Sequence, residues 1–199
     1  MNKLITLAVV TIGFMLVRPA AGIVLLSQDQ ALKQMFPDAA KVTPEVHVLT
    51  AEQAEAAKAQ LGGKWTLYQS GAKEENKGVD SLTFFFATTD GKKTGVALIE
   101  VQPGKWGPVR YIVALDLTGK VTNLAVMSYI EQRGRPIATR RFLDQFIGKN
   151  GESAITVGKD IDAVSGATIS SRATAFAVKK VVVLYETVFP PSTKKKGEQ

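Results

Sequence analysis

The amino-acid sequence predicts an α+β fold in which helices pack on one face of an antiparallel sheet. Two observations favour it. Four consecutive segments in the middle of the chain are rich in β-branched and aromatic residues and are separated by short gaps. The flanking segments return to a helical spacing of apolar residues. A doubly wound parallel sheet would need a helix between successive strands, and the gaps leave no room for one.

The first 22 residues have the layout of a secretory signal peptide, with Lys3 before an apolar run and small residues at the end. The run, residues 4–17, covers about 21 Å as a helix, which is shorter than a hydrocarbon core of roughly 30 Å. If Arg18 reaches the interface, the run extends to Leu26 and about 35 Å, enough for an uncleaved anchor. Both alternatives place the remaining chain at the periplasmic or extracytoplasmic face of the bacterial inner membrane.

Residues 23–80 are predicted to form a helical N-terminal region. An amphipathic stretch covers residues 28–36, and a stronger helix is expected over residues 50–61. Thr50 and Gln53 have the spacing of a capping box, and a glycine pair follows the second helix.

Residues 81–191 are predicted to form the main domain. Its strands are expected at residues 82–87, 95–101, 110–117 and 121–130. Asp90-Gly91 and Thr118-Gly119 are turn signals, so consecutive strands are expected to pair as antiparallel hairpins.

Two helical segments follow the predicted strands. The first covers residues 140–147, and the second runs from about Ser165 to Val188, where Pro190-Pro191 ends it. Residues 192–199 form a basic tail that we expect to be disordered.

Composition excludes several classes of site. The chain has no cysteine, which excludes disulfides, thiolate metal sites, cysteine-ligated iron–sulfur clusters and a thiol nucleophile. A single histidine, His47, cannot supply a multi-histidine metal site. We therefore expect no metal, and any redox cofactor must be organic.

The net charge of +7 is concentrated at the two ends of the chain. Residues 1–22 and residues 192–199 each contribute +2, which leaves +3 for residues 23–191. That is an ordinary solvated surface, so no nucleic-acid partner is expected.

The most informative segment is D-A-V-S-G-A-T-I-S-S, residues 162–171, directly before the long helix. A helix start presents unpaired N–H groups and favours phosphate. Gly166 and Ala167 would let a phosphorylated ligand approach closely, and the Thr168 hydroxyl is a group that can be esterified. Local physics leaves a simpler interpretation open, in which Ser165 or Thr168 caps the helix and Gly166 fits a turn.

This string resembles the flavinylation motif Asp-x-x-Ser-Gly-Ala-Thr of the FMN-binding domain family. That family includes the C subunit of the sodium-pumping NADH:quinone oxidoreductase and the G subunit of the Rnf complex. The resemblance implies an FMN-binding domain fold, and FMN joined through its phosphate to Thr168 by a flavin transferase. Asp162 would belong to the sequence that the transferase recognises.

The resemblance extends over residues 104–184. Matching segments occur at residues 104–108, 117–121 and 142–149, in the family's order and spacing. The chain departs from the family at residues 132–136, where many members have Pro-Gly-Leu-Gly, and before Gly104 it matches only in outline.

The residues expected around the cofactor lie in the motif and in two other segments. They are Trp106, Gly107, Glu131, Ser165, Gly166, Ala167, Ile169 and Ser170. Trp106 would either stack on the flavin or belong to the core. Glu131 would hydrogen-bond the flavin, brace its loop, or be an exposed acid at a strand end.

The resemblance implies an extracytoplasmic electron-transfer flavoprotein that passes electrons between protein partners such as membrane redox subunits or cytochromes. Membrane association would use residues 4–26. An electron carrier is favoured over a stand-alone enzyme, because the sequence has one histidine and no paired carboxylates near the motif. Two alternatives stay open: a module that binds phosphate or another anionic ligand without a covalent bond, and a flavin enzyme acting on a small substrate.

Overall fold

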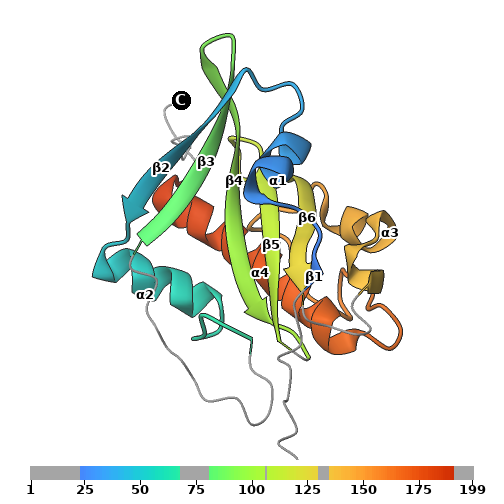
Figure 1. Ribbon diagram of the computed structural model, residues 1–199. Helices are drawn as coiled ribbons and strands as arrows, with labels where there is room; N and C mark the ends of the chain where they lie inside the picture. Colours follow the sequence, from blue (N-terminus) through green and yellow to red (C-terminus); the bar gives the residue numbers. More distant parts are fainter. Residues whose placement is uncertain (1–22, 68–80, 106, 130–134, 191–199) are drawn as a thin grey trace, which may run out of the picture.

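The computed structural model describes residues 23–67, 81–105, 107–129 and 135–190. Six antiparallel strands form one sheet with the order β1-β6-β5-β4-β3-β2 (Figure 1). The strands are β1 (Ile23–Val24), β2 (Lys41–Val48), β3 (Ser81–Thr89), β4 (Lys92–Pro103), β5 (Pro108–Leu115) and β6 (Val121–Tyr129). The helices are α1 (Gln28–Met35), α2 (Ala51–Gln60), α3 (Arg140–Leu143) and α4 (Thr168–Val188), with 3-10 turns η1 (Arg135–Ala138) and η2 (Asp144–Phe146).

The four central strands confirm the predicted hairpins. β3 pairs with β4, β4 with β5, and β5 with β6, each antiparallel. The first hairpin turns at Asp90 and Gly91, whose φ angles are 51° and 73°. Two consecutive positive φ angles suit the right-handed twist of the strands, which is why an Asp-Gly pair stands there.

The described part of the N-terminal region contains two strands as well as two helices, so the prediction of a helical region is corrected. Both expected helices form, and Thr50 and Gln53 make the predicted capping box. However, β2 pairs with β3 along its whole length, and β1 pairs with β6. Pro44 lies within β2 and disfavours a strand in the sequence, but β2 is an edge strand, where a missing N–H is tolerated.

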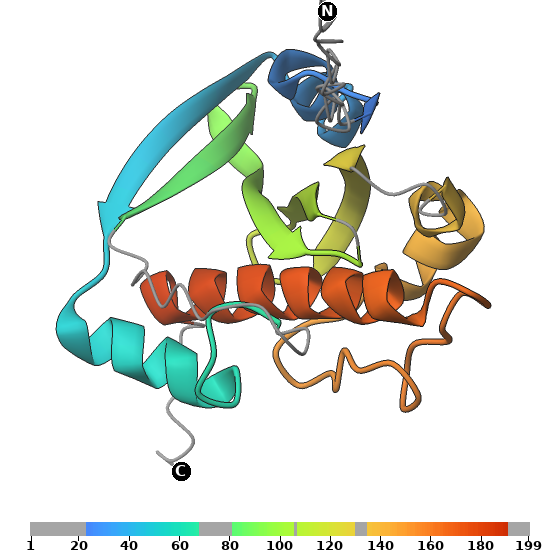
Figure 2. The same cartoon turned by 60° about the horizontal axis from the view of Figure 1, so that its bottom comes forward.

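Helices cover both faces of the sheet, whereas the sequence predicted them on one face. α4 lies across one face with α2 beside it, and α1 lies on the opposite face (Figure 2). The reason is visible in β3, where Phe84 and Phe86 enter the core under α4 while Phe85 packs with α1 on the other side.

The segment predicted as one helix over residues 140–147 forms two shorter pieces, α3 and η2. The tighter 3-10 turn places residues three apart on one side. Leu143 and Phe146 therefore both turn inward, and the rings of Phe142 and Phe146 meet edge to face at 5.6 Å.

α4 is the longest helix of the described part, with 21 residues. The predicted helical spacing of its apolar residues is confirmed, since Ala177, Val181 and Leu184 lie in the core cluster and Ala173 is buried as well. No helix in the described ranges is long and apolar enough to cross a membrane. The predicted leader, residues 1–22, and the predicted tail, residues 192–199, lie outside these ranges.

Candidate functional site

The segment that enters α4 carries the predicted modification site. The side chains of Asp162, Ser165 and Thr168 are exposed, whereas Ala167 and Ser170 are buried. Gly166 has a φ of +75°, a left-handed conformation that glycine adopts without steric cost. The chain turns there, and Thr168 becomes the first residue of the helix with its side chain in solvent.

The expectation that Ser165 or Thr168 caps the helix is wrong. The N-cap residue is Ala167, and no side chain makes a capping hydrogen bond there. An uncapped start of a long helix keeps its positive end available to an anion. The Thr168 hydroxyl thus has no capping role.

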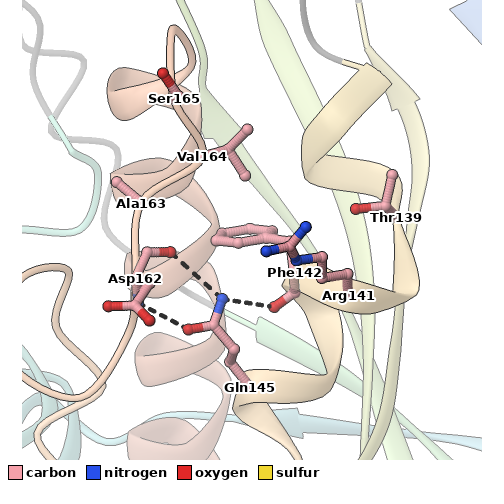
Figure 3. A pocket seen from close by; sticks show the side chains of 8 residues that line it. All are labelled: Thr139, Arg141, Phe142, Gln145, Asp162, Ala163, Val164 and Ser165. Carbon is pink, nitrogen blue, oxygen red and sulfur yellow. Dashed lines mark hydrogen bonds between the residues drawn. The ribbon is translucent and has the colours of Figure 1, made fainter.

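Two side chains, one from the α3–η2 turns and one from α4, hold the segment in place. The Gln145 side chain accepts a hydrogen bond from the Asp162 N–H at 2.8 Å and donates to the carbonyls of Asp162 and Phe142, each at 3.4 Å (Figure 3). The buried Ser171 hydroxyl accepts from the Val164 N–H and donates to the Ala167 carbonyl, both at 3.0 Å. The sequence pattern had indicated no role for either of these two side chains.

A pocket of about 600 Å³ lies between this segment and the α3–η2 turns (Figure 3). Its lining comprises Thr139, Arg141, Phe142 and Gln145 on one side and Asp162, Ala163, Val164 and Ser165 on the other. Arg141 supplies a planar cation that suits phosphate, and the half-buried Val164 supplies an apolar side chain, whereas the Phe142 ring is only 2% exposed. The pocket can therefore hold a ligand with an anionic group beside Arg141 and an apolar part beside Val164.

The sequence of this region matches one family of known domains. The model of the FMN-binding domain matches residues 104–183, which contain β5, β6, the pocket and most of α4. This part of the chain belongs to the FMN-binding domain family.

Solved structures show the same fold as the chain. NqrC of Shewanella oneidensis superimposes with a TM-score of 0.51 at 19% identity, over 79% of this chain and 85% of NqrC. The C subunit of the Na⁺-translocating NADH-quinone reductase of Parabacteroides distasonis gives a TM-score of 0.51 at 16% identity, over 79% of this chain and 82% of that one.

Curated relatives of the FMN-binding domain include the G subunit of the ion-translocating oxidoreductase complex. The Aliivibrio fischeri protein is 34% identical over 119 residues, which are 54% of this chain and 57% of that protein. The Shewanella oneidensis protein is 30% identical over 135 residues, which are 62% of this chain and 63% of that protein. The chain thus spans little more than half the length of the Aliivibrio relative.

Of the other predicted cofactor residues, the structure describes Gly107, Ile169 and Ser170. Gly107 accepts a hydrogen bond from the Gly104 N–H at 2.8 Å in the turn before β5, and it does not line the pocket. Ile169 is half-buried, and Ser170 is 2% exposed, with a carbonyl that accepts from the Thr174 hydroxyl. Trp106 and Glu131 lie outside the described residues, so their predicted roles stay predictions.

Gln145 was not predicted as a site residue, and Arg141 was considered only as one of four arginines that could meet a phosphate, an anionic lipid or an acidic partner. Both lie in the α3–η2 turns, 17 or more residues before the motif segment they face. No periodic pattern marks such a contact, although the match of residues 142–146 to the family pointed at this region. Among the described residues, no group of three histidine, aspartate or glutamate side chains is arranged to hold a metal ion.

Proposed function

We propose that this chain is an extracytoplasmic electron-transfer flavoprotein that carries FMN covalently, through a phosphoester to Thr168. It receives and delivers electrons through protein partners. FMN supplies the redox chemistry, while the chain holds the cofactor and sets its surroundings.

The observation that carries the proposal is the position of Thr168. Its side chain is exposed at the uncapped start of α4, within a D-A-V-S-G-A-T string inside the FMN-binding domain. The positive end of a helix stabilises a phosphate bonded at its first residue. Glycine and alanine before it keep the approach free of bulky side chains.

The covalent step balances with an activated flavin nucleotide such as FAD. The Thr168 hydroxyl oxygen bonds to the phosphorus next to riboflavin, the bond between the two phosphates breaks, and AMP leaves with the threonine proton passing to solvent. The chain gains one FMN less one water. A flavin transferase performs this step, and the exposed Asp162 carboxylate belongs to the surface that it recognises.

The pocket beside the motif is the proposed seat of the flavin. Arg141 balances negative charge, the half-buried Val164 offers an apolar surface, and Ser165 lies at the motif side. Gly166, Ala167, Ile169 and Ser170 form the turn and helix start that carry the phosphoester. Trp106 and Glu131, which lie outside the described residues, stay predicted members of the site, whereas Gly107 does not line this pocket.

The partners are proposed from the relatives and the N-terminal segment. The relatives named above are subunits of ion-translocating oxidoreductase or NADH-quinone reductase complexes. We therefore propose the extracytoplasmic face of the inner membrane for this chain, with residues 1–22 either cleaved as a signal peptide or kept as an anchor. The longer anchor to Leu26 does not fit the structure, because Ile23 and Val24 pair with β6 and the Leu25 and Leu26 N–H groups donate to the Met127 carbonyl. Its redox partners are membrane redox subunits or cytochromes.

Denaturing electrophoresis tests the covalent bond. The protein is exported together with a flavin transferase, unfolded in detergent, and inspected under ultraviolet light. A fluorescent band in the wild type and in T168S, and none in T168A, supports the proposal. Yellow protein that loses all fluorescence on unfolding supports the rival module that holds its ligand without a covalent bond. Turnover of a small substrate by the isolated flavoprotein would instead favour the enzyme alternative.

A further inference from the structure

The motif segment is exposed and yet tied down at both ends. Asp162, Ala163, Ser165 and Gly166 lie in solvent, and within residues 162–167 only Val164 and Ala167 pack against the core. Exposed turns of this kind sample many conformations unless side-chain hydrogen bonds restrict them. Such bonds are present here, and they come from Gln145 and Ser171.

Gln145 bonds to Asp162 in both directions. Its amide oxygen accepts from the Asp162 N–H, and its amide nitrogen donates to the Asp162 carbonyl. The side chain thereby makes one accepted and one donated hydrogen bond to the backbone of a single residue, as a neighbouring β-strand would. A carboxylate of the same length accepts but does not donate, so the neutral amide is the group that satisfies both backbone atoms.

Ser171 closes the other half of the segment from within α4. Its hydroxyl, which is 0% exposed, bridges the Val164 N–H and the Ala167 carbonyl. The Ala167 N–H in turn donates to the Val164 carbonyl at 2.9 Å. The turn that places Thr168 is therefore held by a closed set of bonds.

We infer that Gln145 and Ser171 are positioning residues for the modification of Thr168, because they hold residues 162–167 in the conformation that the flavin transferase binds. The inference rests on the proposed function. It adds that the acceptor segment is arranged before the transferase arrives. A ligand that binds only the arranged fraction of a segment loses apparent affinity in proportion as that fraction falls.

The test measures the transferase reaction with the folded chain as varied substrate and FAD as donor. Q145L and S171A each raise the KM for the chain about tenfold and leave kcat within about twofold, since saturation restores the bound conformation. Q145E also raises KM, because it keeps only one of the three bonds of Gln145.

Two control variants separate positioning from general loss of stability. T174V removes another buried α4 hydroxyl, which bonds to the Ser170 carbonyl and Tyr111 but not to residues 162–167. D144N changes Asp144, the residue before Gln145, and removes the carboxylate that pairs with Arg140. Both controls are expected to keep the wild-type KM.

Amide hydrogen exchange supplies a readout that is independent of the transferase. Q145L speeds exchange at the Asp162 N–H about tenfold, and S171A does so at the Val164 N–H. If the wild type is modified but Q145L and S171A keep the wild-type KM, the inference is wrong while the proposed function stands. Unchanged exchange at both amides also overturns it. A wild type that is not modified at all overturns the proposed function and this inference with it.

Discussion

Lys180 Nζ lies 2.8 Å from Glu100 Oε1, and this ion pair joins α4 to β4 with side chains only 8% and 12% exposed. The Gln102 amide donates to the same carboxylate oxygen at 2.7 Å, and its own oxygen accepts from the Leu67 N–H. Burial raises the pKa of Glu100, and the charge of Lys180 opposes that rise. The pair is thus a buried electrostatic tie between the motif helix and the sheet.

Removing one partner of this pair is expected to lower the free energy of unfolding far more than removing both. The variant K180M leaves the Glu100 charge buried and unpaired, and should lower the free energy of unfolding by about 3–5 kcal/mol. The double variant E100Q/K180M should recover most of that loss, because no uncompensated charge remains. Urea unfolding at pH 7 of both variants measures the difference, and a double variant no more stable than K180M would contradict this account.

Asp160 is expected to make the fold sensitive to acid. Burial alone would raise its pKa, but hydrogen bonds from the N–H groups of Thr156 and Ile155 and from Lys149 lower it below 3.8. A carboxylate with a lowered folded-state pKa stabilises the fold above the unfolded value and loses that contribution as pH falls through the folded value. The loss therefore begins below about pH 4.

The variant D160N should be less stable by about 1–2 kcal/mol at pH 7, since it loses the ion pair with Lys149 and one of the two side-chain oxygens that accept from the Ile155 and Thr156 N–H groups. Its free energy of unfolding should also fall less steeply than that of the wild type between about pH 4 and pH 2. Urea titrations across this range measure both effects. Parallel pH profiles for the two proteins would show that Asp160 carries no acid-linked stability.

Gly95 is expected to tolerate no larger side chain. A Cβ atom there would lie 2.9 Å from Phe36 Cε1 and 3.2 Å from the Leu115 carbonyl oxygen. G95A should destabilise the fold by about 1–3 kcal/mol through overpacking. F36L in the same chain relieves the ring contact but not the backbone one, so the pair of changes should recover part of the loss. Thermal unfolding of the wild type, G95A and the double variant F36L/G95A measures the loss and its partial recovery.

Gly166 differs from Gly95 in that a Cβ atom added to it would meet no other atom within 4 Å. Only its φ of +75° opposes a side chain. G166A should therefore cost about 1–2 kcal/mol, and G166N less, since asparagine adopts the left-handed conformation more readily. G166V should cost the most. Equal losses in G166N and G166V, measured by urea unfolding, would mean that backbone conformation is not the cause.

The central sheet was predictable because its signals are local. Alternating β-branched residues and two turn dipeptides mark the hairpins, and the spacing of apolar residues marks α4. β2 escaped prediction because Pro44 is acceptable only on an edge strand, and edge position is a property of the whole sheet. The placement of α1 on the second face likewise depends on how the strands combine.

The sequence pointed to the candidate site only at Thr168, the proposed attachment residue. The motif string indicated Thr168 through its residue types, and the family resemblance supplied the chemistry. The bond between Gln145 and Asp162 joins residues 17 apart, and the pair of Glu100 and Lys180 joins residues 80 apart. Such contacts arise from packing of the α3–η2 turns and α4, which leaves no periodic trace in the sequence.

The intact mass of the exported protein tests the central claim most directly. Wild-type chain co-expressed with a flavin transferase should be heavier than the unmodified chain by one FMN less one water, and peptide mapping should place that mass on Thr168. T168A should show no gain under the same conditions. A wild-type chain of unmodified mass, or a T168A chain that still gains the flavin, would contradict the account.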